Sequence, residues 1–526
     1  MTEPVPRRFN LARYCLGPAP HRPPDRVALL VVHHPEEPLR GVERWTFGEL
    51  DDAVRACAAG LLGLGLQRGD RVVLRLGNTS EFAVLFFACA AAGLVAVPTS
   101  PQLTPEEVAF VVDDVRASAL ALAPELAAGV DPPHGVRPVT PGDVRAWREA
   151  GPRAGWADTG GEDPAYLVFT SGTSGVPKGV LHGHRAVWGR RPMYAGWHDI
   201  REGDTVLHAG SLNWTYTLGV GLTDPWAVGA TAVVSVGPPD PRAWGRLVAA
   251  TEATVFAAVP GVFRQVLSRG DLREGDLRTL RHVVTAGEAL SPALRTAWGE
   301  RTGLEMYEAL GMSEVSTFVS SSPTVPVHPG SPGRPQAGRR VAVLTVDGER
   351  PVPVGARGLL AVHRSDPGLM LRYWERPEED AAVTRGEWFV SADLVDLDDD
   401  GYVHHHGRAD DVMTSLGYRV SPLEVEHCLA QHPGVADVAV TEVPVREELT
   451  VVTAFVVPRD CGLLGGGTGE GGRASGAFEA DLVAHARARL AAYKCPRQVR
   501  IVATLPRTAN GKLIRRELRR VPDVDG

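Results

Sequence analysis

The sequence predicts an α/β protein with a large N-terminal domain of two parallel-rich sheets and their helices, a small β-barrel, and a smaller α+β C-terminal domain. Three observations support this prediction. The chain has 526 residues, which is more than one hydrophobic core usually holds, so we expect more than one domain. Helical and strand patterns alternate through the first half, and short strands joined by turns follow from Val341 onward.

The alternation begins near the N-terminus. Residues 54–66 carry small and apolar side chains at helical spacing, and residues 71–77 (RVVLRLG) are typical of a strand. Strands that alternate with helices pair in parallel and are covered by those helices. The same patterns recur as helices at 80–93 and 105–115 and as strands at 94–98, 119–124, 231–236 and 254–260.

The pattern changes in the second half of the chain. Residues 341–352, 358–363 and 388–407 are typical of short strands, and their Asp-Gly dipeptides indicate hairpin turns. We expect a small barrel or meander that closes the large domain.

A compact α+β pattern begins after Arg408. The glycine-rich stretch 462–476 predicts a flexible surface loop within it. The other expected elements are helices at 422–431 and 479–490 and strands at 435–443 and 450–457.

Charge and cysteine content exclude several classes of protein. The net charge is -8 with acidic and basic residues interspersed, so we expect no nucleic-acid binding. The most apolar run, residues 83–97, is shorter than the about 20 residues of a membrane helix, so we expect no membrane span. Six cysteines without CxxC pairs and an N-terminus without a secretion signal predict a reduced, cytoplasmic protein.

A turn rich in hydroxyls and glycines follows an apolar strand that starts at Tyr166. Glycines let backbone amides converge on an anion, hydroxyls donate further hydrogen bonds, and a lysine supplies charge. It is not a Walker A loop, because Pro177 and Gly179 flank the lysine where that motif needs Gly and Ser or Thr. A polar turn between strands is the alternative. The predicted phosphate site comprises Thr170, Ser171, Gly172, Thr173, Ser174, Gly175 and Lys178.

Residues 169–180 (FTSGTSGVPKGV) resemble the signature of the adenylate-forming superfamily, which includes acyl-CoA and aryl-CoA synthetases, luciferases and adenylation domains of peptide synthetases. Further matches follow in the superfamily's order, so the similarity extends from Thr46 to Leu518. The resemblance implies an acid:CoA ligase that uses ATP, Mg²⁺ and coenzyme A, forming acyl-AMP and then an acyl-CoA thioester. Within the superfamily the chain is similar to benzoate-CoA ligases and medium-chain acyl-CoA synthetases, which implies that the substrate is an aromatic or medium-chain acid.

Two segments resemble elements that contact adenine and the phosphates. In residues 307–314 (YEALGMSE), the resemblance assigns Ser313 to the α-phosphate and Glu314 to Mg²⁺, while Leu310 departs from the usual adenine-stacking tyrosine. Taken alone, such a segment is also typical of a helix cap. Residues 285–290 (TAGEAL) resemble the loop that frames adenine, which assigns Ala286, Gly287 and Glu288.

Two later segments resemble the ribose strand and the interdomain link. Residues 388–393 (WFVSAD) imply that Asp393 accepts both ribose hydroxyls, although a strand-end aspartate entering a turn is the alternative. In residues 407–419 (GRADDVMTSLGYR), Arg408 would reach the nucleotide and Asp410 would be the hinge. The coenzyme A arm would approach Gly417, Tyr418 and Arg419.

The last match lies near the C-terminus. Residues 506–512 (PRTANGK) resemble the motif whose lysine, here Lys512, contacts the substrate carboxylate and the α-phosphate during adenylation. The resemblance makes Lys512, Glu314 and Thr170 the candidate catalytic residues. It also implies an N-terminal adenylation domain at 1–409 and a mobile C-terminal domain at 410–526.

The acid pocket of the superfamily lies beside the segment that matches residues 213–222. Trp214 and Tyr216 would offer flat apolar walls, and Gly311 would leave room for an acid larger than acetate. The alternative is that both aromatic side chains belong to the hydrophobic core, because large aromatic residues are usually buried wherever they occur.

Other functions and assemblies remain open from the sequence. The chain could instead load a carrier-protein phosphopantetheine, or release acyl-AMP, and a homodimer is open. His404, His405 and His406 are expected as strand residues rather than metal ligands, because consecutive strand residues point to opposite faces. His182 and His184 have no triad partner in the sequence, so serine nucleophile chemistry is not expected.

Overall fold

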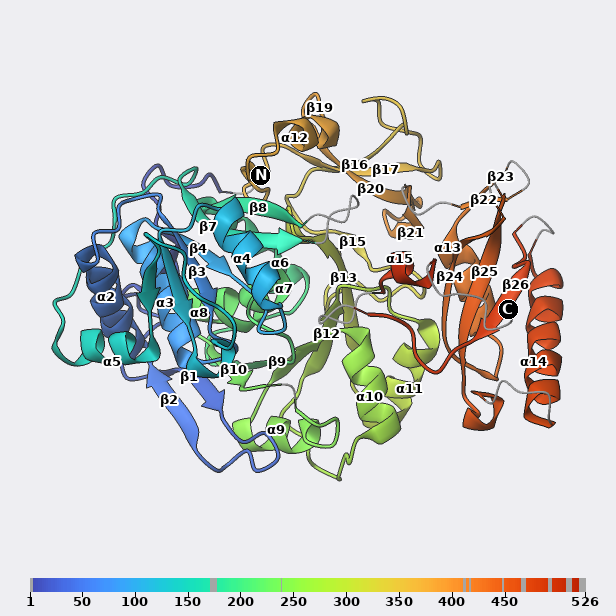
Figure 1. The fold of residues 1–526 in the computed structure, drawn as a ribbon, viewed down its shortest axis with the longest axis horizontal. Helices are drawn as coiled ribbons and strands as arrows, with labels where there is room; N and C mark the ends of the chain where they lie inside the picture. Colours follow the sequence, from blue (N-terminus) through green and yellow to red (C-terminus); the bar gives the residue numbers. More distant parts are fainter. Residues whose placement is uncertain are drawn as a thin grey trace. The chain divides into compact units, whose positions relative to one another are not determined.

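The chain divides into two compact units. The computed structural model describes residues 3–170, 177–237, 239–409, 413–415, 418–446, 449–464, 470–490, 494–507 and 513–519. The first unit comprises Met1–Val341, Val362–Phe389 and Gly401–Val403, and the second comprises Ala342–Ala361, Val390–Asp400 and His404–Gly526. Two segments from the middle of the sequence therefore group with its C-terminal part (Figure 1).

The largest sheet lies in the first unit and confirms the parallel-rich prediction. Its six central strands, from β13 to β1, run parallel. At the edges β2 pairs antiparallel with β1, β14 with β13, and β15 with β14. The order is β15 (Arg334–Pro335), β14 (Ser316–Ser320), β13 (Met306–Met312), β12 (His282–Ala286), β11 (Val255–Ala258), β9 (Thr205–His208), β10 (Thr231–Ser235), β1 (Val27–Val32) and β2 (Val42–Thr46).

A second sheet of the first unit carries the predicted phosphate loop. Strands β7, β4, β3, β5 and β6 run parallel, and β8 and β18 are added antiparallel at one edge. The order is β18 (Arg372–Tyr373), β8 (Lys178–Gly183), β7 (Pro164–Thr170), β4 (Val95–Pro98), β3 (Arg71–Arg75), β5 (Ala119–Leu122) and β6 (Arg137–Val139).

Helices cover these sheets, and several begin at a capping residue. Thr46 caps α2: its hydroxyl accepts from the Glu49 N–H while the Glu49 carboxylate accepts from the Thr46 N–H. The predicted helix at 54–66 therefore begins earlier, at Phe47. Figure 1 shows α2, α3 and α5 beside one another. The helices of this unit are α1 (Leu11–Leu16), α2 (Phe47–Gly63), α3 (Ser80–Ala92), α4 (Pro105–Asp114), α5 (Pro141–Ala150), α6 (Arg191–Gly196), α7 (Thr215–Leu218), α8 (Asp224–Val228), α9 (Trp244–Thr251), α10 (Pro260–Arg269), α11 (Pro292–Thr302) and α12 (Pro377–Val383).

Short strands follow the large sheets, as the change of pattern at Val341 predicts. They form a third sheet, in which β20 pairs with β21 in addition to its neighbours in the strand order. The path runs through β16 (Val341–Leu344), β17 (Gly358–His363), β20 (Trp388–Leu397) and β19 (Thr384–Arg385), with β21 at Val403–Arg408.

The C-terminal part of the second unit is α+β, as predicted. In its core, Val425 of α13 and Leu482 of α14 pack against the sheet residues Val440 and Val452. The strands are β22 (Met413–Ser415), β23 (Tyr418–Val420), β24 (Val435–Arg446), β25 (Leu449–Pro458) and β26 (Gln498–Ile501), and the helices are α13 (Pro422–Ala430), α14 (Glu470–Arg487) and α15 (Arg515–Leu518).

The prediction of a loop at residues 462–476 is wrong for the second half of that segment. Helix α14 begins at Glu470, so residues 470–476 are helical, and the helix predicted at 479–490 starts earlier than expected. The Ser475 hydroxyl donates to the Glu479 carboxylate (3.3 Å), which pairs residues one helical turn apart. Glycine lowers helix propensity, but packing of α14 on β26 and α13 outweighs that weak preference.

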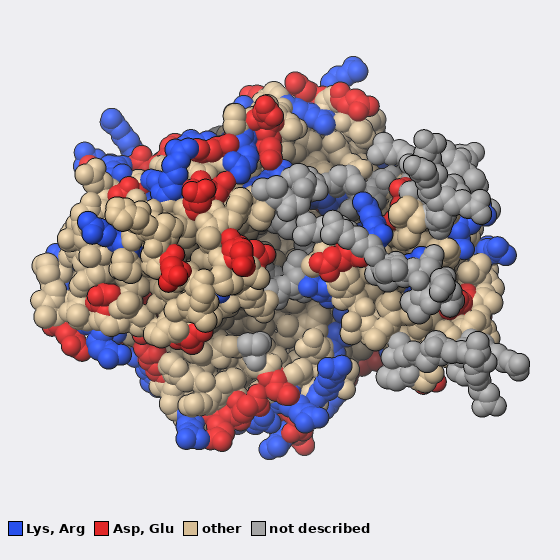
Figure 2. All heavy atoms as spheres, viewed as in Figure 1, with Lys and Arg blue, Asp and Glu red and all other residues tan. Residues whose placement is uncertain are grey.

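Surface charge and apolar content agree with the sequence. Figure 2 shows Lys and Arg interspersed with Asp and Glu over the face in view. None of the helices in the described ranges is long and apolar enough to cross a membrane.

Candidate active site

The ends of the predicted phosphate loop are held by the hairpin of β7 and β8. Thr170 and Lys178 are paired in the antiparallel register, so the two residues face each other at the end of the hairpin where its strands are joined. A Cβ at Gly179 would lie 2.9 Å from Leu167 Cδ2 and 3.1 Å from Trp374 Cβ, which explains the glycine by close packing. The remaining predicted loop residues, Ser171, Gly172, Thr173, Ser174 and Gly175, lie outside the described residues.

Tyr373 joins the phosphate hairpin to the predicted metal ligand. The ammonium of Lys178 lies 5.5 Å from the centroid of the Tyr373 ring, and it forms an ion pair with Glu379. The Tyr373 hydroxyl donates to Glu314 Oε1 (2.7 Å). Burial, together with the negative charge of Glu314, raises the pKa of Tyr373, so the phenol stays protonated and remains a donor. Lys178 and Glu314, far apart in sequence, are thus brought to one tyrosine.

The turn that carries Ser313 and Glu314 is held from two sides. It joins β13 to β14, and the Nε2–H of His182 donates to the Ser313 carbonyl (2.8 Å). Burial lowers the pKa of His182 to about 4, so the ring is neutral at physiological pH. Ser316, at φ +75°, follows the turn, and its hydroxyl accepts from the guanidinium of Arg190. His182 therefore supports the backbone of this turn.

A buried ion pair anchors that guanidinium. Arg190 donates from Nε and Nη2 to the two carboxylate oxygens of Asp224 (2.6 and 2.7 Å), and both side chains are at most 5% exposed. His198 Nε2 lies 3.3 Å from the same carboxylate. Burial alone would raise the pKa of Asp224, but the charge and hydrogen bonds of Arg190 lower it to about 2. The sequence contains no local pattern for this pair, because its partners are 34 residues apart.

The predicted adenine loop follows the carboxyl end of β12. Ala286 is buried, and the Glu288 carboxylate accepts from the Gly261 N–H (3.1 Å). Gly287 has φ +98°, and a Cβ there would lie 2.6 Å from Trp214 Cη2. The glycine therefore allows the indole of Trp214 to approach the backbone of this loop.

The three predicted acid-pocket residues have different surroundings. Tyr216 is 6% exposed, and its hydroxyl donates to the carbonyls of Ala258 and Val284 (3.4 and 3.3 Å). Its ring packs with that of Trp214 in an edge arrangement, 5.3 Å between centroids. A Cβ at Gly311 would lie 2.4 Å from the Ser316 carbonyl oxygen. The close approach of the β14 backbone thus gives a structural reason for glycine at this position, beside the predicted one.

Asp393, His405 and Arg408 come together in the second unit. His405 Nε2 lies 3.1 Å from Asp393 Oδ1, and Arg408 acts on the same carboxylate by its charge. The Asp393 N–H donates to Ser391 Oγ (3.1 Å), whose hydroxyl donates to the Leu360 carbonyl (3.1 Å). Burial opposes ionisation of Asp393, but the His405 hydrogen bond and the nearby positive charges lower its pKa.

The three consecutive histidines lie on β21, as expected for strand residues. His404 Nε2 lies 3.0 Å from the Asp398 carboxylate, and His406 bonds Asp396. His405 bonds Asp393 instead, on the other side of the strand.

The link and the C-terminal motif are described only in part. Tyr418 and Arg419 belong to β23, which pairs with β22 in a hairpin. The predicted hinge Asp410, the predicted coenzyme A residue Gly417 and the predicted catalytic Lys512 lie outside the described residues.

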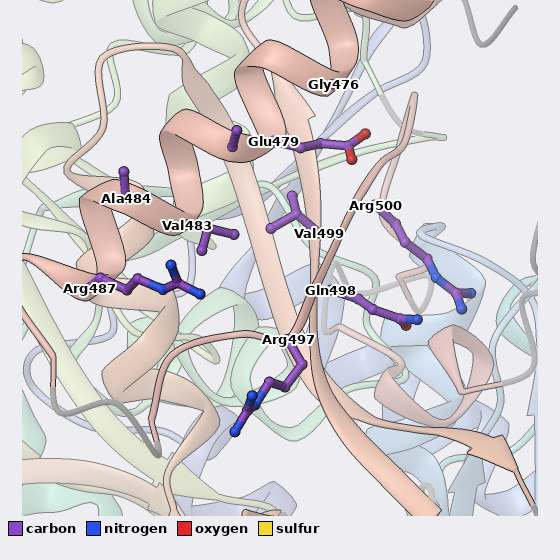
Figure 3. A pocket seen from close by; sticks show the side chains of 10 residues that line it. Gly476, Glu479, Val483, Ala484, Arg487, Arg497, Gln498, Val499 and Arg500 are labelled. Atoms are coloured by element: carbon purple, nitrogen blue, oxygen red, sulfur yellow. The ribbon is translucent and has the colours of Figure 1, made fainter.

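A separate groove of about 760 Å³ lies between α14 and β26 (Figure 3). Arg487, Arg497 and Arg500 are among its lining residues, and no predicted site residue is.

Comparison with known families covers most of the chain. Residues 18–374 match the AMP-binding enzyme family, and residues 424–512 match the AMP-binding enzyme C-terminal domain.

Individual relatives agree with these matches. The chain is 33% identical over 489 residues to the benzoate–CoA ligase of Thauera aromatica, covering 90% of each protein. It is 31% identical to the 3-hydroxybenzoate–CoA ligase of Aromatoleum sp. (strain CIB), covering 91% of this chain and 92% of that protein. Among solved structures, a benzoate CoA ligase from Burkholderia xenovorans LB400 superimposes with a TM-score of 0.85 at 29% identity, covering 97% and 100% of the two chains. An anthranilate CoA ligase in complex with anthranoyl-AMP gives a TM-score of 0.84 at 28% identity and covers 98% of each chain.

Proposed function

Because this chain belongs to the AMP-binding enzyme family and is an ATP-dependent acid:CoA ligase, we propose that it activates an aromatic or medium-chain carboxylic acid. The family resemblance drawn from the sequence is thereby confirmed. One observation supports the assignment of roles most strongly: Tyr373 contacts both Lys178 of the phosphate hairpin and Glu314 of the following motif.

The reaction has two half-reactions. In the first, a carboxylate oxygen of the acid attacks the α-phosphorus of ATP, and the bond to pyrophosphate breaks to give acyl-AMP. In the second, the sulfur of coenzyme A attacks the acyl carbon, its proton is released, and AMP leaves. The protein contributes chiefly by positioning the reactants and stabilising charge on the phosphates.

We assign the phosphates of ATP to the β7–β8 hairpin. Thr170 and Lys178 face each other there, so a hydroxyl and an ammonium lie at the two ends of the loop. The ammonium of Lys178 is paired with Glu379 in this structure, so phosphate oxygens would compete with that carboxylate. The Ser313 side chain is proposed to contact the α-phosphate.

Glu314 is the proposed ligand of Mg²⁺. A carboxylate is the hard oxygen donor that this ion prefers, and the hydrogen bond from Tyr373 to Oε1 fixes the group in one orientation. When bound, Mg²⁺ would neutralise charge on the phosphates. Tyr373 is the residue that sequence reasoning missed here.

Residues of the second unit are proposed to contact the rest of the substrates. Asp393 would accept the ribose hydroxyls, with Arg408 near the nucleotide. Lys512 would contact the reacting carboxylate and α-phosphate, and Asp410 would be the hinge between the two half-reactions. Gly417, Tyr418 and Arg419 are proposed for coenzyme A.

The adenine and the acid are assigned to the first unit. Ala286, Gly287 and Glu288 would frame adenine, and Trp214 and Tyr216 would face the acid. Trp214 lies against Gly287. A change at either residue is therefore expected to affect both nucleotide and acid.

A product assay tests the proposal. The protein would be incubated with ATP, Mg²⁺ and a panel of benzoates and medium-chain fatty acids, with either coenzyme A or a phosphopantetheinyl carrier protein. We expect acid-dependent pyrophosphate release and a product with the mass of the acyl-CoA. Lys512→Ala should abolish most acid-dependent pyrophosphate release. Pyrophosphate release that is unchanged in this variant, or a carrier-protein thioester as the sole thioester product, would contradict the proposal. Cytoplasmic location and a homodimer stay predictions.

A further inference from the structure

Each histidine of β21 bonds an aspartate that lies in β20 or directly after it, and one of these pairs includes the proposed ribose ligand. His405 donates from Nε2 to Asp393 Oδ1 at 3.1 Å. The side chains are 21% and 13% exposed, so the hydrogen bond is largely shielded from water. Shielded, charge-assisted hydrogen bonds of this kind are stronger and more directional than those between exposed neutral groups.

The backbone of Asp393 is held independently of His405. Its N–H donates to Ser391 Oγ, and the Ser391 hydroxyl donates in turn to the Leu360 carbonyl. Those bonds fix where the residue lies. The Ser391 hydroxyl and the charge of Arg408 also act on the carboxylate. His405 donates directly to Oδ1 and is therefore one of the groups that restrict rotation of the carboxyl group.

The carboxylate keeps enough capacity for a ligand. An ionised carboxyl group has two oxygens and about four acceptor positions. Donors from His405 and Ser391 therefore still leave two acceptor positions for hydroxyl groups. The lowered pKa of Asp393 means that the group is an acceptor only, as recognition of two hydroxyl donors requires.

We propose that His405 is a positioning residue for nucleotide recognition, holding the Asp393 carboxylate in the orientation in which it accepts the ribose hydroxyls. This inference rests on the proposed function, because it assumes that Asp393 binds the ribose. His405 does not contact the nucleotide in this scheme. It acts through Asp393, so its effect depends on whether the nucleotide has ribose hydroxyls.

The test compares ATP with 2′,3′-dideoxy-ATP. The wild-type enzyme should have a KM for the dideoxy nucleotide roughly 10- to 100-fold above that for ATP, since hydrogen bonds to a charged group are lost. His405→Phe removes the donor and should raise the KM for ATP roughly tenfold while leaving that for dideoxy-ATP nearly unchanged. The ratio of the two values should therefore fall to a few-fold. His405→Gln, whose amide can donate, should restore part of the ratio.

His404→Phe is the matched control. His404 lies on the same strand and also bonds an aspartate through Nε2, but its partner is Asp398, directly after β20, rather than Asp393. This variant should keep the wild-type ratio. A merely structural role of the histidines would instead lower activity equally with both nucleotides. If His405→Phe is not obtained folded, His405→Asn, whose shorter amide does not reach Asp393, should lose the ratio in its place.

Two results would overturn the proposal, and Asp393→Asn separates them. If Asp393→Asn loses the ratio but the His405 variants keep it, the positioning role is wrong and the ribose assignment stands. If the Asp393→Asn variant keeps the ratio, the ribose assignment itself fails. Loss of the ratio in both variants, with retention in His404→Phe, supports the inference.

Discussion

The pair formed by Arg190 and Asp224 allows a test of how strongly burial governs an ion pair in this protein. Arg153 and Asp52 form the same bidentate arrangement, with Nε and Nη2 donating to the two oxygens at 2.7 and 2.6 Å. The geometry is equivalent, but Asp52 is 54% exposed and Asp224 is fully buried. Replacing each aspartate with asparagine therefore makes the same chemical change in two different environments.

The expected free energies of unfolding differ accordingly. Asp224→Asn leaves the buried guanidinium of Arg190 without a counter-charge, which is expected to destabilise the first unit by about 3–5 kcal/mol. Asp52→Asn breaks an exposed pair that water and salt already screen, so about 1 kcal/mol or less is expected. Arg190 also holds the Ser316 hydroxyl, so Asp224→Asn should loosen the turn that carries Glu314 as well.

Guanidinium unfolding followed by tryptophan fluorescence measures the two effects. Hydrogen exchange in peptides from α8 and α2 locates each effect, because the protein has two units and a single two-state transition is not assumed. We expect faster exchange around α8 in Asp224→Asn and near wild-type exchange around α2 in Asp52→Asn. Equal losses of stability in the two variants would refute the reasoning that burial decides the strength of this pair.

Three further predictions follow from the same structure. The pKa of Asp224 is about 2 in the folded state, below the about 3.9 of an unfolded chain. Its stabilising contribution is therefore present above pH 4 and is lost as the pH falls through 2. The urea concentration at the unfolding midpoint should fall more steeply between pH 5 and pH 2 in wild type than in Asp224→Asn. Tyr373→Phe removes the donor to Glu314 and should raise the Mg²⁺ concentration needed for half-maximal pyrophosphate release roughly tenfold, and an unchanged Mg²⁺ titration would count against the assigned ligand. Gly311→Ala places a Cβ against the β14 backbone and should lower the free energy of unfolding by about 1–3 kcal/mol. Gly299→Ala, in α11 with open space around it, should leave that free energy unchanged or raise it by up to about 1 kcal/mol. Thermal unfolding of the two variants measures both effects.

The sequence predicted the fold class well because the relevant patterns are local. Alternating helix and strand patterns predicted the parallel sheets, and contiguous motifs identified the Ser313–Glu314 segment and the strand that carries Asp393. The partners of those residues were not predictable in the same way. Tyr373 is 59 residues from Glu314 and belongs to no motif that we identified, so the fold alone brings them together. His405 was expected only as a strand residue, since its bond to Asp393 depends on the pairing of β20 with β21.

One prediction was wrong because it relied on composition. Glycine content suggested a loop before Glu479, but composition reports only an intrinsic preference, and packing of α14 decided the outcome. The room for a substrate beside Gly311 stays a prediction, and the close approach of β14 gives a second reason for glycine there. A glycine in the sequence does not reveal which neighbour it accommodates.

The division of the chain into two units has a consequence for synthesis and for truncation of this protein. Ala342–Ala361 and Val390–Asp400 group with residues that are translated much later. During synthesis from the N-terminus, these two segments leave the ribosome before their partners from His404 onward, such as β21, exist. A fragment that stops before His404 would retain both segments without those partners, so removing the C-terminal residues alone would not yield the first unit by itself.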